Sequence, residues 1–212
     1  FKVRWGEDNV EASQVDFAIT LFAGLLIFNL FSEIMNRAPY LILSNISYVK
    51  KIIFPLELLP LVSIGTVLFH SILTLLVLLV IHFLFKGYIP WTVVYTPIVL
   101  IPVLLAGLGI SWFLSAITVY IRDIAQVTGL FTTILLYISA VFFPITALPP
   151  QYQILLLFNP LALIVSESRK IMVFNQSPDW AILSLTLLVG ILMALVGYWW
   201  FEKARKGFAD VL

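Results

Sequence analysis

The sequence predicts an all-α polytopic membrane protein. Of its 212 residues, 62% are apolar and 11% are charged, and the mean hydropathy is +1.09. A soluble domain carries roughly 25% charged residues, so this chain has too few to cover a surface in water. Several apolar runs reach the ~20 residues that a helix needs to cross a bilayer. These observations exclude a soluble enzyme, a disordered tail and a collagen-like rod.

Apolar runs separated by charges and turn residues define the elements in order. We predict five membrane spans, at Asp16–Asn36, Leu58–Phe85, Trp91–Tyr120, Ile124–Ala147 and Asp179–Phe201. A sixth apolar stretch, Tyr152–Val165, is interrupted by a proline and is too short to cross ~30 Å of hydrocarbon. We therefore expect the segment 148–178 to form a re-entrant hairpin of two short helices, and the segment 1–212 to form one transmembrane domain.

The distribution of basic residues predicts the orientation of these spans. Spans in series alternate sides, and cytoplasmic loops carry the excess of Lys and Arg. One side has seven basic residues (Arg37, Lys50, Lys51, Arg122, Lys203, Arg205 and Lys206), and the other has five (Lys2, Arg4, Lys86, Arg169 and Lys170). This favours a cytoplasmic 37–57 segment and an external 148–178 segment. Because the chain starts at Phe1 and not at Met, we expect a further span to precede it.

The predicted cytoplasmic segment is longer than a turn needs. Apolar residues recur in it at roughly helical spacing, namely Leu41, Ile42, Ile46 and Val49. Pro39 and Pro55 bracket the segment as helix breakers. Two interpretations stay open: a surface helix that docks into a cytoplasmic partner, or an interfacial helix whose Lys50 and Lys51 contact anionic lipid headgroups.

A second short connection has a charged pair. Arg122 and Asp123 lie between two predicted spans with almost no other loop. They can hydrogen-bond a partner subunit, or act as a topogenic charge with Asp123 capping the next helix.

Polar residues also lie inside the predicted spans. Ser63, Thr66, His70 and Thr74 share one helical face, and Asn29 and Glu33 are four positions apart. Hydrogen bonding between helices is the simplest role for them. A proton relay is the alternative, and it would use Glu33, His70 and His82. The row of Gly107, Ser111 and Ser115 predicts close helix packing.

Motifs for catalysis and nucleotide binding are missing from the sequence. It has no G-x-x-x-x-G-K-[ST] phosphate loop, no His/Glu metal-ligand spacing, no G-x-S-x-G elbow and no cysteine. We therefore expect no catalytic, metal or cofactor site in this chain. The net charge of +1 also argues against nucleic-acid binding.

Several segments together resemble the permease subunit of ABC type-2 exporters, in the bacterial branch that moves O-antigen, capsule or teichoic acid. They are Asn45 with Val49-Lys50-Lys51, Phe54-Pro55-Leu56-Glu57, Trp112-Phe113, Tyr120 through Asp123, Phe143-Pro144 and Asn159-Pro160 with Arg169. The resemblance implies six spans in the whole permease and a homodimer in the inner membrane. It also implies two separate ATPase subunits, which bind ATP and Mg, and a lipid-linked glycan as the substrate.

The resemblance also implies roles for particular residues. The residues expected at the ATPase are Asn45, Val49, Lys50, Lys51, Phe54, Arg122 and Asp123. Those expected at an external gate are Pro149, Asn159, Pro160 and Arg169. Aromatic faces can stack on sugar rings, and the candidates along a passage are Trp112, Tyr137, Phe142 and Phe143. Two alternatives stay open: a drug or lipid exporter of the same superfamily, and an ion-coupled carrier that needs no ATPase.

Overall fold

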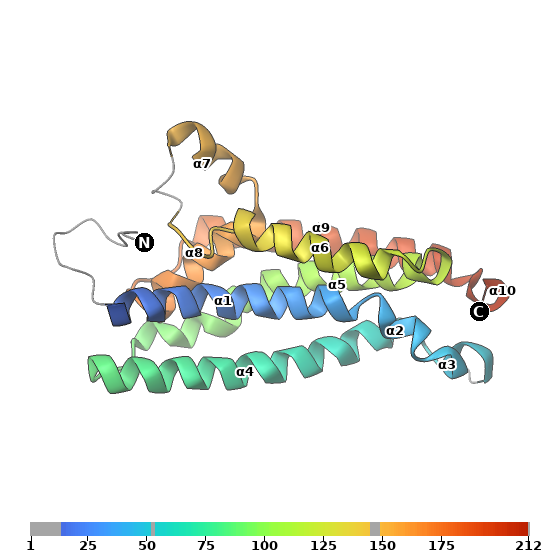
Figure 1. Cartoon of the computed structure of the whole chain (residues 1–212), viewed down its shortest axis with the longest axis horizontal. Coiled ribbons are helices and arrows are strands. Elements are labelled where there is room, and N and C mark those ends of the chain that lie inside the picture. The colour runs from blue at the N-terminus through green and yellow to red at the C-terminus, as the bar shows by residue number, and fades with distance from the viewer. Residues whose placement is uncertain (1–13, 52–53, 145–148, 212) are drawn as a thin grey trace.

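The computed structural model describes residues 14–51, 54–144 and 149–211, and these form a bundle of helices with no strand among them (Figure 1). Four elements are long and apolar enough to cross a membrane. They are α1 (Gln14–Arg37), α4 (Leu58–Lys86), α5 (Thr96–Tyr120) continued from the 3₁₀ helix η1 (Trp91–Tyr95), and α9 (Trp180–Arg205). The predicted all-α membrane class is confirmed.

Short helices gather at the two ends of the bundle (Figure 1). One end, here called the α2/α3 end, has α2 (Tyr40–Leu43), α3 (Ile46–Lys51) and α10 (Phe208–Val211). The opposite end, here called the α8 end, has α7 (Pro150–Leu157) and α8 (Pro160–Met172). While α8 packs against α1, α5 and α9, α7 stands away from the bundle. The two short helices return without crossing the bundle.

The length predicted for the fourth span is wrong. Its helix, α6, covers Ile124–Ile138, or 15 residues, and measures about 22 Å against ~30 Å of hydrocarbon. The helix stops because Ala140 has a φ of 53°, in the left-handed region that a right-handed helix cannot include. The carbonyls of Ala140 and Val141 are bound by Arg169 and not by a continuing helix. The last predicted residues of this span lie outside the described ones.

The prediction of a single helix in the segment 37–57 is also wrong, because the segment forms two short helices, α2 and α3. Ser44 Oγ donates to the Tyr40 carbonyl at 2.6 Å, and Asn45 Nδ2 donates to the Leu41 carbonyl at 2.9 Å. Side chains of Ser and Asn compete in this way with the backbone of a helix. The apolar periodicity therefore continues although the helix is interrupted between α2 and α3.

The most extensive helix contact joins α5 and α9, and glycines allow it. A Cβ added at Gly197 would lie 2.1 Å from the Gly109 carbonyl oxygen, and one added at Gly109 would lie 2.2 Å from the Met193 carbonyl oxygen. The two backbones therefore touch, as small residues permit in membrane helix pairs. The predicted row of small residues on α5 is buried, but its Gly107 faces Ile34 of α1.

Candidate functional site

A buried arginine joins three parts of the chain at the α8 end. Arg169 of α8 is 3% exposed, and its guanidinium donates to the carbonyls of Thr20 at 3.2 Å, of Ala140 at 2.9 Å and of Val141. Burial lowers the pKa of Arg169 to about 9, so the group remains charged at neutral pH. The fork of N–H donors in guanidinium suits several carbonyls at once. Arg169 thus holds α8, α1 and the turn after α6 in one arrangement.

Asn159 holds the same turn from the other end of α8. Its side-chain oxygen caps α8 by accepting from the Leu161 N–H at 3.0 Å, while Pro160 starts the helix. Its amide nitrogen donates at 3.3 Å to both the Ile138 carbonyl and the Ser139 hydroxyl. The predicted gate residues Asn159 and Arg169 therefore converge on residues 138–141. Pro149 is exposed and is not part of this group of contacts.

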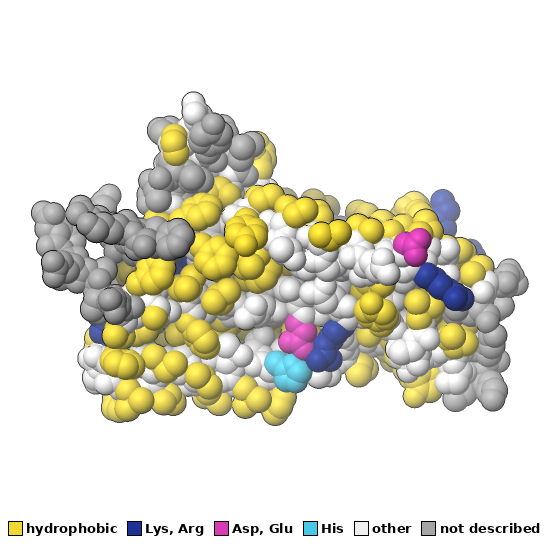
Figure 2. Space-filling model, viewed as in Figure 1, with side chains coloured by type: hydrophobic (Ala, Val, Ile, Leu, Met, Phe, Trp, Pro, Cys, Tyr) yellow, Lys and Arg dark blue, Asp and Glu magenta, His cyan; other side chains and the backbone are white. Residues whose placement is uncertain are grey.

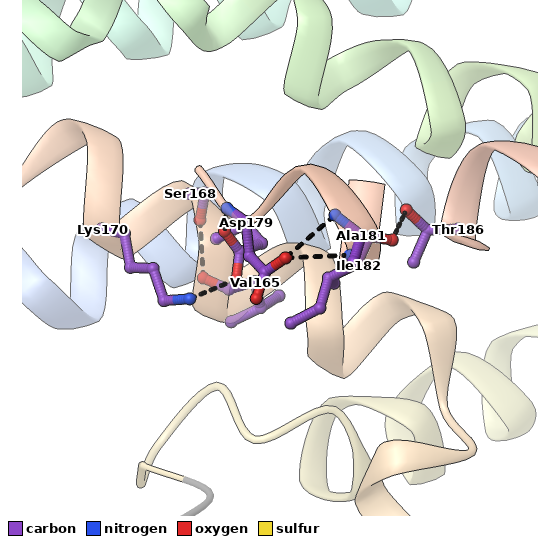
Figure 3. Close-up of polar contacts among 8 residues, drawn as sticks. Val165, Ser168, Lys170, Asp179, Ala181, Ile182 and Thr186 are labelled. Atoms are coloured by element: carbon purple, nitrogen blue, oxygen red, sulfur yellow. Dashed lines mark hydrogen bonds and ion pairs between the residues drawn. The ribbon is translucent and has the colours of Figure 1, made fainter. Parts of the chain in front are cut away.

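A fully buried carboxylate joins α8 to the start of α9. Glu167 is 0% exposed and accepts from Lys170 Nζ at 2.6 Å and from the Asp179 backbone N–H at 2.8 Å. Figure 3 shows Lys170 and Asp179 together with the start of α9. Asp179 in turn caps α9 by accepting from the Ala181 N–H at 2.9 Å. Thr92 of η1 adds a further contact by donating to the Ile171 carbonyl at 2.6 Å. Hydrogen bonds thus join α8 to α1, to η1, to the turn after α6 and to the start of α9.

The predicted ATPase-contacting segment packs on an apolar cluster at the α2/α3 end. The buried members of this cluster come from α2, α5, α9, α10 and the loop before α4, and they are Ile42, Leu56, Trp112, Ala116, Val119, Phe201 and Phe208. Val49 and Phe54 are partly buried against it, and the Phe54 ring stacks on Tyr48 with centroids 5.0 Å apart. Asn45 forms the turn between α2 and α3. The side chains of Lys50 and Lys51 lie outside the described residues.

The charged turn between α5 and α6 lies at the same end of the bundle (Figure 1). Arg122 and Asp123 are both exposed. Asp123 occupies the N-cap position of α6, but its side chain makes no capping hydrogen bond. The interpretation of Asp123 as a cap therefore lacks the contact it requires, and both side chains are accessible to a partner.

The structure does not bring the four predicted passage residues together. Trp112 is 9% exposed, donates its indole N–H to the Glu57 carbonyl at 3.1 Å, and packs edge-on against Tyr198. Tyr137 is 62% exposed and lies 5.9 Å from Phe142, measured between ring centroids. Phe143 is half-buried near Leu156 and Ala162, which removes it from the open surface. Of these four candidates, Tyr137 and Phe142 are the two with exposed rings.

Two of the three candidate relay residues meet. Glu33 Oε1 lies 2.8 Å from His70 Nδ1 and 2.6 Å from an Arg37 nitrogen, so it joins α1 to α4. His82 is buried and lies twelve positions further along α4, or about 18 Å from His70. The expected hydrogen bond between helices is therefore present, whereas a relay through both histidines would have to bridge that distance.

Comparison with known protein families identifies the family of this chain. The family model described as ABC-2 type transporter matches residues 2–173, which is most of the chain. The chain belongs to the ABC-2 type transporter family. It is therefore a transport permease and a multi-pass protein of the inner membrane.

This ABC-2 chain is also similar to curated proteins over almost its whole length. An O-antigen export system permease protein RfbA of Klebsiella pneumoniae is 22% identical over 202 residues, covering 93% of this chain and 76% of the relative. The protein of the same name from Myxococcus xanthus is 24% identical over 197 residues, with 92% and 76% covered. The resemblance inferred from scattered motifs is thus confirmed at the level of the family.

Four features of the ABC-2 chain could not be inferred from the sequence. Glu167 was not singled out, because it lies in the polar run from Ser166 to Lys170, where a carboxylate gives no signal of burial. Gly24, which lies against the Arg169 guanidinium, and the pair of Gly109 and Gly197 were also missed, because the sequence around a glycine in an apolar span does not show which residue packs against it. The ion pair of Arg205 with Glu57, at 2.5 Å, joins segments 148 positions apart.

Proposed function

We propose that this chain is the transmembrane subunit of an ATP-driven exporter that moves a lipid-linked polysaccharide across the bacterial inner membrane. The observation that carries the proposal is the similarity, over more than nine-tenths of the chain, to two permeases named for O-antigen export. In the proposed assembly two copies of the permease pair with two ATPase subunits, which bind ATP and Mg. The permease itself contributes no catalytic group.

The α2/α3 end supports the proposal, because its surface is suited to receive a partner. Val49 and Phe54 rest on the apolar cluster that contains Val119 of α5 and Phe201 of α9. A displacement of α3 by the ATPase would therefore reach α5 and α9, whose backbones touch. Packed cores transmit such shifts because they have low compressibility. Arg122 and Asp123 are exposed at the same end and would contact the ATPase directly.

The α8 end supports a gate built on a fixed base. Arg169, Asn159 and Glu167 bind α8 to its neighbours, whereas α7 stands away from the bundle. We propose that α8 stays in place and that α7 moves when the polymer leaves. Pro149 and Pro160 lie at the two ends of this α7 segment.

The experiment is purification of the full-length protein from its host, followed by an ATPase assay and a measurement of surface polysaccharide in a deletion strain complemented with variants. We expect a stoichiometric ATPase partner, and loss of both ATPase stimulation and export in the Arg122→Ala/Asp123→Ala double variant. Gln176→Ala, an exposed polar change at the α8 end but outside α7, is the matched control. A permease that purifies alone and transports under an ion gradient would overturn the proposal. A complex whose loss leaves the polysaccharide unchanged and whose ATPase responds to small amphiphiles would favour the drug or lipid exporter.

A further inference from the structure

One face of α1 changes from apolar to polar along its length. Five residues three or four positions apart share this face, and they are here called the polar stripe: Asn29, Ser32, Glu33, Asn36 and Arg37. All five are exposed or half-buried, whereas the opposite face of α1, with Ile27, Leu30 and Ile34, is buried. The stripe is therefore a surface and not a part of the core.

The polar stripe begins at the depth of the hydrocarbon and ends, at Asn36 and Arg37, near its boundary. The ion pair of Asp16 with Lys86 marks the α8 end of α1. Asn29 is 13 positions beyond Asp16 and Glu33 is 17, which corresponds to about 20 Å and about 25 Å along the helix. Because the hydrocarbon is ~30 Å thick, these residues lie within it, in the half nearer the α2/α3 end.

Lipid is an unfavourable neighbour for this surface. The side chains of Arg37 and Glu33 are 41% and 29% exposed, and that of His70 of α4, which contacts Glu33, is 44% exposed. A charged side chain costs roughly 2.5–3.5 kcal/mol at the centre of a spanning helix, and Glu33 lies between that centre and the α2/α3 end. Figure 2 shows an acidic, a basic and a histidine side chain side by side on the face in view, next to an area with few apolar side chains. This face is therefore expected to meet water or polar groups.

The chemistry of the polar stripe suits a hydroxylated and uncharged ligand. Glu33 and Arg37 have opposite charges that cancel, and Asn29, Asn36 and Ser32 each offer both donors and acceptors. Helix α6 borders the stripe, since the Thr132 hydroxyl lies 3.5 Å from Asn36 Oδ1. A mixture of donors and acceptors without net charge matches sugar hydroxyls, which both donate and accept. It matches neither an ion nor an apolar amphiphile.

We propose that the polar stripe, with His70, is a hydrogen-bonding surface for the sugar units of the exported glycan. The proposal rests on the proposed function and adds to it a location for the substrate, on α1 between α4 and α6. It differs from the passage predicted from aromatic residues, because the contacts here are hydrogen bonds. Many weak and similar contacts would allow a polymer to advance without a single tight site.

Single-cysteine labelling tests the location, and these 212 residues contain no cysteine. Asn29→Cys, Ser32→Cys and Asn36→Cys are treated with a membrane-impermeant maleimide, in strains that make the polysaccharide and in strains blocked in its synthesis. We expect labelling in the blocked strain and protection when the glycan is present. The controls are Leu76→Cys on the exposed apolar face of α4 and Ile27→Cys in the core. Absence of labelling in the stripe, or equal labelling in both strains, would overturn the proposal.

A second experiment separates sugar binding from a purely structural role of the cluster. Glu33→Gln and Arg37→Gln should each lower the export rate about fivefold, the effect of losing one hydrogen bond, at unchanged yield and ATPase binding. Asp16→Asn is the matched control, because it breaks the other ion pair between α1 and α4. An equal loss in the control, or no loss in the two stripe variants, contradicts the proposal. If the wild-type protein exports no polysaccharide, the proposed function itself fails.

Discussion

The guanidinium of Arg169 lies in the space that a side chain on Gly24 would fill. A Cβ added at Gly24 would be 2.5 Å from Arg169 Nη2 and 3.1 Å from Cζ. The arginine cannot move aside at low cost, because three backbone carbonyls bind it. A residue in α1 and a residue in α8, 145 positions apart in the sequence, therefore depend on each other.

Gly24→Ala should lower the free energy of unfolding by about 1–3 kcal/mol, the usual cost of overpacking a core. Thermal unfolding of the purified protein in detergent measures it. Gly129→Ala in α6 is the matched control, because nothing lies within 4 Å of its added Cβ, and it should be neutral or stabilising by about 0.5–1 kcal/mol. Equal unfolding temperatures for the two variants would contradict this account of Gly24.

Arg169→Met should destabilise the protein by about 3 kcal/mol or more, since it leaves buried carbonyls without donors. Arg205→Met is the comparison. Arg205 is 37% exposed and pairs with Glu57, so its loss should cost at most about 1 kcal/mol. Limited proteolysis of α7 and the preceding turn adds a second measurement, because cleavage should be faster in Arg169→Met alone. Similar stabilities for the two arginine variants would show that the hydrogen bonds of Arg169 to α1 and to the turn after α6 do not stabilise the fold.

Gly197→Ala should be among the most damaging single-methyl changes in the chain. Its Cβ would approach the Gly109 backbone oxygen, which cannot rotate away as a side chain can. We expect a loss of about 3 kcal/mol or a failure to accumulate in the membrane. Gly65→Ala in α4, where the added Cβ meets nothing within 4 Å, should accumulate normally. Normal accumulation and stability of Gly197→Ala would contradict the backbone contact between α5 and α9 at Gly109 and Gly197.

Trp112→Phe and Tyr137→Leu should have opposite consequences. Trp112→Phe removes the hydrogen bond to the Glu57 carbonyl and should cost about 0.5–1.5 kcal/mol of stability, with export unchanged. Tyr137→Leu changes an exposed side chain, so stability should stay within about 0.5 kcal/mol. Its export rate should fall if open aromatic faces contact the glycan. A fall in export for Trp112→Phe at normal stability would contradict this account, because it would mean that Trp112 contacts the glycan.

Much of the fold follows from hydropathy alone. The starts of α4, η1, α6 and α9 lie within one residue of the predicted spans, because charges and prolines mark where apolar runs begin. The early end of α6 was not predictable in this way. Val141 and Phe142 are as apolar as the helix before them, and the helix stops because Arg169, far away in sequence, binds the carbonyls that follow it.

The residues of the candidate site could be named from the sequence, but their contacts could not. Asn159 and Arg169 were singled out by the family resemblance, yet nothing in their spacing says that both bind residues 138–141. Trp112 and Tyr137 look equivalent in the sequence, and only packing separates the buried ring from the open one. Glu33 and His70 were candidates to meet, but the relative register of two helices cannot be read from either one.

The sequence by itself determined that this protein lies in a membrane, is helical and has charged connections at 37–57 and at Arg122 and Asp123. Those properties follow from the transfer of single residues and short runs between water and hydrocarbon, which depends on local composition. Only the tertiary structure decided which carbonyls Arg169 binds, that α5 and α9 touch at Gly109 and Gly197, and that a polar stripe of α1 remains open. Those properties depend on the distances between helices, which the packing of all of them sets together.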